Sequence, residues 1–135
     1  MVKTSLVEAD LLAGWRLLIA IDAGYGDLFR VKAAFWMFYP ESEEWRLVIA
    51  TPLVDEQGPL STYRNVQHIL FEIQPSDLSL QNIAVISPKD ALAKAFRTAM
   101  RIAPESTYFR SRRTSVAGHY VEDAYVYRIP PPIDF

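Results

Sequence analysis

The sequence predicts an α+β fold, in which a mixed five-stranded sheet packs against three helices in the order αββαβαββ. Two observations carry this prediction. Segments with apolar residues at helical spacing alternate with short runs rich in β-branched and aromatic residues. Turn-forming residues also join two pairs of those runs closely enough for hairpins. The 135 residues contain no internal repeat and no low-complexity linker, so we expect a single domain, residues 1–135, with short tails at residues 1–5 and 130–135.

A first helix is predicted from about Leu6 to Ala23. Ser5 and Glu8 have the spacing of a capping box, in which the two side chains accept hydrogen bonds from each other's backbone N–H groups. Gly24 or Gly26 supplies the stop. The apolar residues between these signals recur at helical spacing, at Leu11, Leu12, Trp15, Leu18 and Ile19.

Two strands are predicted next, Phe29–Tyr39 and Glu44–Thr51, joined by a turn at Pro40 into an antiparallel hairpin. The first of them becomes apolar on both faces in its second half, where Trp36 and Phe38 lie on the face that begins polar. A strand that is apolar on both faces is normally central and covered twice. We therefore expect Trp36 and Phe38 to be largely buried.

The middle of the chain predicts two helices separated by the short buried strand Ile83–Ile86. Gly58-Pro59 opens the earlier helix and Pro75 ends it, whereas the later one starts with a cap at Ser87 and ends before Pro104. Both helical connections are long enough for parallel crossovers, which is why the sheet is predicted to be mixed. We expect one helix on one face of the sheet and two on the other.

A second hairpin is predicted from Thr107–Ser115 and His119–Ile129, with Ala117-Gly118 as its turn. If the turn has two residues, counting outward places Arg113 opposite Glu122 and Arg112 opposite Asp123. Opposite charges across a ladder contribute about 0.2–1 kcal/mol, so their structural role is to set the register. The three prolines that follow residue 129 cannot pair in a sheet.

A functional interpretation of the same hairpin stays open. Strand alternation places Asp123 on one face with Val121, Tyr125 and Tyr127, an aromatic setting in which a carboxylate needs a partner. Arg112 supplies that partner in this interpretation, and such a pair is able to hold a polar ligand. The candidate ligand-binding residues are therefore Arg110, Arg112, Arg113, His119, Glu122, Asp123 and Tyr125.

The same segment holds a cluster of arginines and aromatic residues, formed by Arg110, Arg112 and Arg113 with Tyr108 and Phe109. Residues 97–113 contain five arginines and one glutamate, a net charge of +4. Sheets bind single-stranded nucleic acid with such residues. The whole chain, however, has a net charge of −2, which makes nucleic acid an unlikely partner.

Composition excludes several kinds of chemistry. The absence of cysteine excludes disulfides, thiolate metal sites and cysteine nucleophiles, and two histidines are too few for a three-histidine metal site. The chain has no Gly-x-Ser-x-Gly elbow, and its Gly24-Tyr25-Gly26 segment precedes a strand rather than a helix. No catalytic residue, metal or other cofactor is predicted. The apolar runs are shorter than the roughly 20 residues of a membrane helix and no signal peptide is visible, so we expect a cytoplasmic protein without a membrane partner.

Two segments resemble stretches of small bacterial proteins of unknown function. They are residues 44–55, EWRLVIATPLVD, running on to Gly58-Pro59, and residues 120–128, YVEDAYVYR. The resemblance implies a bacterial source and no activity, cofactor or site residue.

The function we expect is that of a small non-enzymatic accessory or interaction protein that associates with itself or with a protein partner. The 7 Phe, 7 Tyr and 3 Trp residues offer more large apolar surface than three helices cover, and Tyr, Trp and Arg concentrate at binding surfaces. One alternative is a module that binds a ligand or single-stranded nucleic acid with the C-terminal hairpin. An enzyme of unrecognised type is the other.

Overall fold

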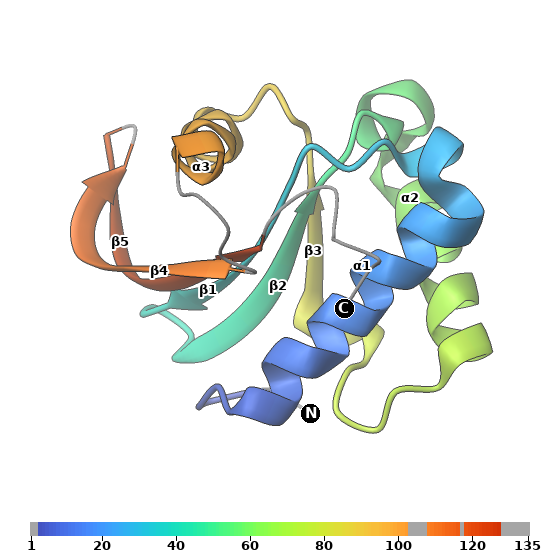
Figure 1. Ribbon diagram of the computed structural model, residues 1–135, viewed down its shortest axis with the longest axis horizontal. Helices are drawn as coiled ribbons and strands as arrows, with labels where there is room; N and C mark the ends of the chain where they lie inside the picture. The colour runs from blue at the N-terminus through green and yellow to red at the C-terminus, as the bar shows by residue number, and fades with distance from the viewer. Residues whose placement is uncertain (1–2, 103–107, 117, 128–135) are drawn as a thin grey trace.

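A five-stranded sheet lies between two layers of helices in the computed structural model (Figure 1). The structure describes residues 3–102, 108–116 and 118–127, and of residues 100–102, 108 and 109 the backbone alone. The predicted α+β class and order αββαβαββ are confirmed. The elements, with a short 3₁₀ helix η1 before the third strand, are α1 (Glu8–Phe29), β1 (Ala33–Tyr39), β2 (Glu44–Ala50), α2 (Leu53–Ile73), η1 (Leu80–Asn82), β3 (Ile83–Ile86), α3 (Ala91–Ile102), β4 (Tyr108–Val116) and β5 (His119–Tyr127).

The strand order is β3-β2-β1-β5-β4, and the sheet is mixed as predicted. Only β2 and β3 pair in parallel, whereas β1–β2, β1–β5 and β4–β5 are antiparallel. The connection through α2 is therefore a parallel crossover, as its length allows. The connection through α3 is not one, because α3 leads from β3 at one edge to β4 at the other edge, which runs in the opposite direction.

The two helical layers cover β1 from both sides, with α1 and α2 on one face of the sheet and α3 on the other (Figure 1). Trp36 belongs to the core beneath α1 and α2, and its neighbour Phe35 belongs to the core beneath α3; each is 0% exposed. The expected burial of Trp36 is thus confirmed. Phe38 is only half-buried, with its ring centroid 5.5 Å from that of Trp45, because it lies near the end of β1.

The ends of α1 differ from the prediction. The helix begins at Glu8 rather than Leu6, and the carboxylate of Asp10, not that of Glu8, accepts the hydrogen bond from the backbone N–H of Val7 at 2.9 Å. It kinks at Tyr25, between the two glycines, where φ is −136° and ψ is 19°, and then continues to Phe29 and stops at Arg30, whose φ is 48°. Phe29 is fully buried, and burial of its apolar ring stabilises the last turn of the helix. A glycine permits a helix to end but does not require it.

The other two helices also begin at different residues from those predicted. α2 starts at Leu53, where the hydroxyl of Thr51 accepts the Leu53 N–H at 3.2 Å, and Gly58 with φ 85° is a kink inside it. α3 is capped by Asp90 rather than Ser87, since the Asp90 carboxylate accepts the backbone N–H of Leu92 at 2.9 Å. Asp and Ser are equally good N-cap residues, so the sequence alone does not distinguish Asp90 from Ser87 as the cap.

Strand boundaries follow the predictions more closely. β3 spans Ile83–Ile86 as predicted, and β2 ends one residue before the predicted Thr51. β1 begins at Ala33 rather than Phe29, because Phe29 belongs to α1. The predicted continuation of the last strand beyond residue 127, the three prolines and Ala117 lie outside the described residues.

A buried polar network ties α1 to the sheet. The indole N–H of Trp36 donates to the hydroxyl of Tyr127 at 2.9 Å, and that hydroxyl donates to the backbone carbonyl of Leu11 at 2.6 Å. Gly14 of α1 faces this pair without a side chain, and a Cβ at Gly14 would lie 2.5 Å from the Tyr127 oxygen. The absence of a side chain at Gly14 therefore lets the helix approach β1 and β5 closely.

Candidate functional site

The register of the C-terminal hairpin matches the prediction at one of the two charged pairs. Val116 pairs with His119, and Arg112 pairs with Asp123 as predicted. Arg113 has a φ of 47° and is not part of the ladder, although pairing resumes beyond it in the same register. Its guanidinium nevertheless remains near Glu122, with 3.9 Å from Nε to Oε1.

The main partner of Asp123 is Arg110, two residues before the expected one. Arg110 donates two hydrogen bonds to the carboxylate, of 3.0 Å from Nε and 2.7 Å from a terminal nitrogen. Arg112 Nε lies farther away, at 3.9 Å. The guanidinium of Arg110 also stacks 4.8 Å from the ring centroid of Tyr125, and its bond to Asp123 raises the pKa of Arg110. Two bonds and a stacked ring hold Arg110 in place more firmly than a single contact would.

The prediction that Val121, Tyr125 and Tyr127 lie on one face of β5 with Asp123 is wrong for Val121. Val121 is buried in the core beneath α3 together with Ala124 and Val126, whereas Tyr125 and Tyr127 belong to the opposite core. Regular alternation would put Val121 and Tyr125 on one face. The alternation shifts where Arg113 and Glu122 drop out of the ladder.

The charged residues of the hairpin border a small hollow of about 200 Å³. Phe38 and Trp45 line it together with the ion-paired side chains of Arg112, Arg113, Glu122 and Asp123. This volume is below the roughly 300–1,000 Å³ of typical small-molecule sites. Because its charges already have partners, the cluster is better suited to holding the hairpin in register than to binding a ligand.

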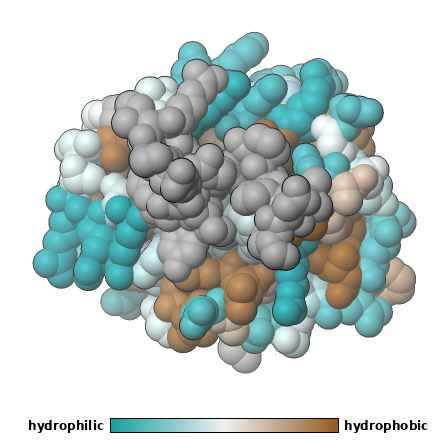
Figure 2. All heavy atoms as spheres, in the orientation of Figure 1, coloured by the Kyte–Doolittle hydropathy of each residue, from teal (hydrophilic) through white to brown (hydrophobic). Residues whose placement is uncertain are grey.

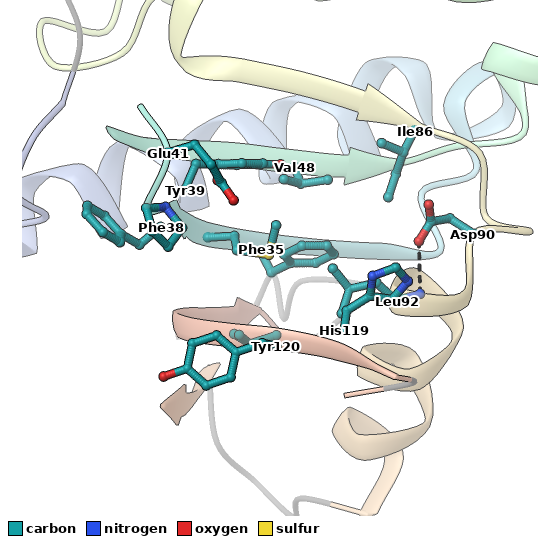
Figure 3. Close-up of a pocket in the computed structure, with 13 residues that line it drawn as sticks. Phe35, Phe38, Tyr39, Glu41, Val48, Ile86, Asp90, Leu92, His119 and Tyr120 are labelled. Carbon is teal, nitrogen blue, oxygen red and sulfur yellow. Dashed lines mark hydrogen bonds between the residues drawn. The ribbon is translucent and has the colours of Figure 1, made fainter. Parts of the chain in front are cut away.

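A second, larger hollow of about 400 Å³ lies on the opposite face of the sheet, beside α3 (Figure 3). We call it the α3 groove and define it by its apolar floor and its polar rim. The helix α3 packs mainly against β1, β4 and β5. At the far edge of the sheet, Ala84 and Ile86 of β3 are only partly buried on this face. A single 12-residue helix is too short to cover five strands, so a hollow remains at its N-terminal end.

The floor of the α3 groove is apolar. Phe35 and Val48 are buried beneath it, and the ring of Phe35 packs against Phe96 of α3 with 4.7 Å between centroids. Met37 and Leu92 are partly buried at its sides. These residues come from β1, β2 and α3, so the sheet and the helix together shape the surface.

Polar side chains surround this floor: Tyr39, Glu41, Asp90 and His119. Glu41 lies in the turn between β1 and β2 at one end, and Asp90 lies before α3 at the other end (Figure 3). His119 comes from the start of β5, on the side opposite Val48 in the same view. The groove therefore combines an apolar bed with groups that can orient a polar head.

The pKa of the Tyr39 hydroxyl depends on burial and on the charges near this groove. Burial raises the pKa of the Tyr39 hydroxyl, and the negative charges of Asp90 and Glu44 raise it further. The guanidinium of Arg46, 5.8 Å from the centroid of the Tyr39 ring, acts in the opposite direction. The hydroxyl therefore stays protonated at neutral pH and remains a neutral hydrogen-bonding group.

The structure divides the residues that the sequence singled out. Arg110, Arg112, Arg113, Glu122, Asp123 and Tyr125 gather on one side of the hairpin, whereas His119 lines the α3 groove. The side chains of Tyr108 and Phe109 lie outside the described part of the chain, so the arginine–aromatic cluster of the sequence is only partly described.

Sequence reasoning missed most of the α3 groove. In the sequence, Asp90 is only an acid near the start of the helix that follows Ser87, and Glu41 is only part of the turn at Pro40. The available signal was the short third helix, because a single helix on one face of a five-stranded sheet leaves part of that face open.

The remaining histidine lies in a separate cluster. His68 Nε2 is 3.0 Å from Glu72 Oε1, and the hydroxyl of Tyr25 donates to the same carboxylate oxygen. Among the described residues, no group of three or more His, Asp or Glu side chains has an arrangement that holds a metal ion. Within the same part of the chain, no helix is long and apolar enough to cross a membrane.

Comparisons of the chain with protein-family models, curated proteins and solved structures found no match. The resemblance of residues 44–55 and 120–128 to small bacterial proteins therefore stays a prediction.

Proposed function

We propose that this protein is a small ligand-binding module whose site is the α3 groove. The observation that carries the proposal is the groove itself, about 400 Å³ with the buried Phe35 and Val48 in its floor. Its volume lies within the range of small-molecule sites, and such sites are mostly apolar with a few convergent polar groups. Of the candidate ligand-binding residues named from the sequence, His119 lines this groove and the other six do not.

The proposal is tested with an uncharged fluorescent probe, N-phenyl-1-naphthylamine, whose emission rises in an apolar site. Wild-type protein should raise that emission saturably. Met37→Trp places a bulky ring at the side of the groove, so the affinity for the probe should fall at least about tenfold, or about 1.4 kcal/mol. Circular dichroism checks that the variant remains folded.

Leu60→Trp is the matched control, since it adds the same side chain at a position on α2 that is 65% exposed and outside the groove. This variant should bind the probe as the wild type does. Equal binding by Met37→Trp and wild type, or equal losses in both variants, would place the probe elsewhere and refute the proposal.

Self-association is a second candidate function, favoured by exposed apolar side chains in the α1–α2 layer. Leu60 is 65% exposed and Phe71 is 71% exposed on α2, while Leu12 is 51% exposed on α1. Figure 2 shows apolar side chains over the N-terminal half of α1 and beside α2, with hydrophilic ones between them. Such side chains are typical of contact surfaces when they form a continuous patch.

For this candidate we expect sedimentation to report a species heavier than the 15.4 kDa monomer. The double variant Leu60→Ser/Phe71→Ser should shift the mass to that of the monomer, because it removes the two most exposed apolar side chains of α2. Tyr120→Ser, which removes an exposed ring from the hairpin, should leave the mass unchanged. A monomeric wild type would exclude self-association.

A further inference from the structure

The charged side chains that line the α3 groove all have the same sign. Glu41 and Asp90 are the acids, and no lysine or arginine is among the described residues that line it. Arg46 does not line the groove; its guanidinium lies 5.8 Å from the centroid of the Tyr39 ring and is paired with Glu44 at 2.6 Å. The mouth of the groove is therefore acidic above an apolar floor.

The two acids lie at opposite ends of that floor (Figure 3). Asp90 is held by the cap of α3, and its negative charge acts across the groove on the hydroxyl of Tyr39. Both carboxylates thus contribute to the field at the rim. Because the floor beneath them has a low dielectric, their effect on a bound charge is stronger than in open water.

Aromatic side chains also line the groove. Tyr39 supplies a partly buried neutral phenol to the rim, and Tyr120 supplies an exposed one. The ring of Phe35 is 0% exposed and packs against Phe96 beneath them. The negative face of an aromatic ring attracts ammonium groups, and aromatic side chains together with carboxylates are the usual means of binding amines. A carboxylate ligand would instead meet Glu41 and Asp90, with no lysine or arginine among the described residues that line the groove.

We propose that the α3 groove binds a cationic amphiphile, a small molecule that carries a protonated amine or a quaternary ammonium on an apolar body. The apolar body lies on the partly buried side chains of Met37, Ile86 and Leu92, and the cation lies at the rim beside Glu41 or Asp90. This inference rests on the proposed function, because it names the chemical class of ligand for the same site.

The test uses three ligands with one body and three head groups: 4-phenylbutylamine, 4-phenylbutanol and 4-phenylbutyrate. Their dissociation constants are measured by calorimetry or NMR titration at neutral pH and low salt. We expect the amine to bind at least about tenfold more tightly than the alcohol, and the butyrate to bind more weakly than the alcohol. The preference for the amine should shrink at 0.5 M salt, where exposed charges are screened.

Two conservative variants test which side chains cause the preference. Asp90→Asn keeps an N-cap on α3, and Glu41→Gln keeps the shape of an exposed side chain, so each removes only a charge. In the double variant the ratio of amine to alcohol affinity should fall to within about threefold, while the alcohol binds as before. His119→Gln should keep the preference, because it removes neither carboxylate.

Asp77→Asn is the control for net charge, since it removes one negative charge from the exposed loop after α2. It should leave the ratio unchanged. If none of the three ligands binds, the proposed function fails together with this inference. If the alcohol binds but the amine gains nothing, or if the double variant keeps the preference, the groove binds ligands without selecting cations and this inference alone is overturned.

Discussion

Gly14→Ala should destabilise the protein by about 2–4 kcal/mol, although the change adds only one methyl group. An alanine Cβ would lie 2.5 Å from the hydroxyl oxygen of Tyr127 and 2.9 Å from the indole nitrogen of Trp36. Either α1 moves away from the sheet or the buried hydrogen bond between the two rings breaks. Both responses leave polar groups of the core poorly satisfied. Urea unfolding followed by far-UV circular dichroism measures the loss.

Gly24→Ala provides the matched control within the same helix. No heavy atom lies within 4 Å of a Cβ at Gly24, so the methyl group meets no neighbour. Alanine also has a higher helix propensity than glycine, and we expect Gly24→Ala to stabilise the protein by about 0.5–1 kcal/mol. Equal effects of the two substitutions would mean that α1 does not pack on Trp36 and Tyr127 through Gly14.

A double-mutant cycle separates the contact from a general effect on the helix. Tyr127→Phe alone should cost about 1–3 kcal/mol, because the Trp36 N–H loses its buried acceptor. In the combination Gly14→Ala/Tyr127→Phe the new methyl group no longer meets a hydroxyl. The combined loss should therefore be smaller than the sum of the single losses by about 1–2 kcal/mol, whereas additive losses would contradict the contact.

Trp36→Ala should cost about 3–5 kcal/mol of unfolding free energy. The Trp36 side chain is 0% exposed in the core between the sheet and α1, so its removal leaves a large cavity. The substitution also deprives the Tyr127 hydroxyl of a hydrogen-bond donor. Chemical denaturation measures the change. If the variant is too unstable to purify, Trp36→Phe supplies a smaller loss of the same sign. A loss below about 1 kcal/mol for the alanine variant would contradict the central position of Trp36.

Phe38→Ala is the comparison on the same strand and the same face. The sequence alone predicts a similar cost for both rings, since both lie on an apolar face of one strand. In the structure Phe38 is only half-buried, so we expect its loss to be smaller than that of Trp36, at about 1–2 kcal/mol. The difference between the two variants measures how far the helical layer extends along β1.

The local sequence pattern predicted the structure correctly where it favoured a single secondary structure or a single strand register. Ile83–Ile86 is a short apolar run between polar loops, and it forms β3 within the predicted limits. The turn after Val116 sets the register of the last hairpin, so the pairing of Arg112 with Asp123 follows by counting. Such features depend on neighbours in the sequence, which a pattern contains directly.

The local sequence pattern gave a wrong prediction where two residues were equally suited to one structural role, or where tertiary packing decided between them. Ser87 and Asp90 are both good caps, and only the position of the first turn on the sheet selects Asp90. Arg110 and Arg112 both reach toward Asp123, and stacking on Tyr125 favours Arg110. α1 kinks at Tyr25, between Gly24 and Gly26, but the helix continues beyond the kink to the buried Phe29.

The α3 groove belongs to the features that no local pattern contains. Met37, Asp90 and His119 are far apart in the sequence and come together because β1, the start of α3 and the start of β5 meet on one face of the sheet. The sequence placed His119 beside a hairpin turn and Asp90 in the first turn of a helix. Neither position by itself indicates a site.

The sequence by itself determined the α+β class, the order of the elements, the mixed sheet and the central, doubly covered β1. Each of these depends on the period of apolar residues and on the length of the connections, which are properties of the chain before it folds. Only the tertiary structure decided where α1 ends, which arginine pairs with Asp123 and which face of the sheet stays open. Those outcomes depend on which surfaces meet, because burial and hydrogen bonding between distant segments outweigh the small energetic differences among local signals.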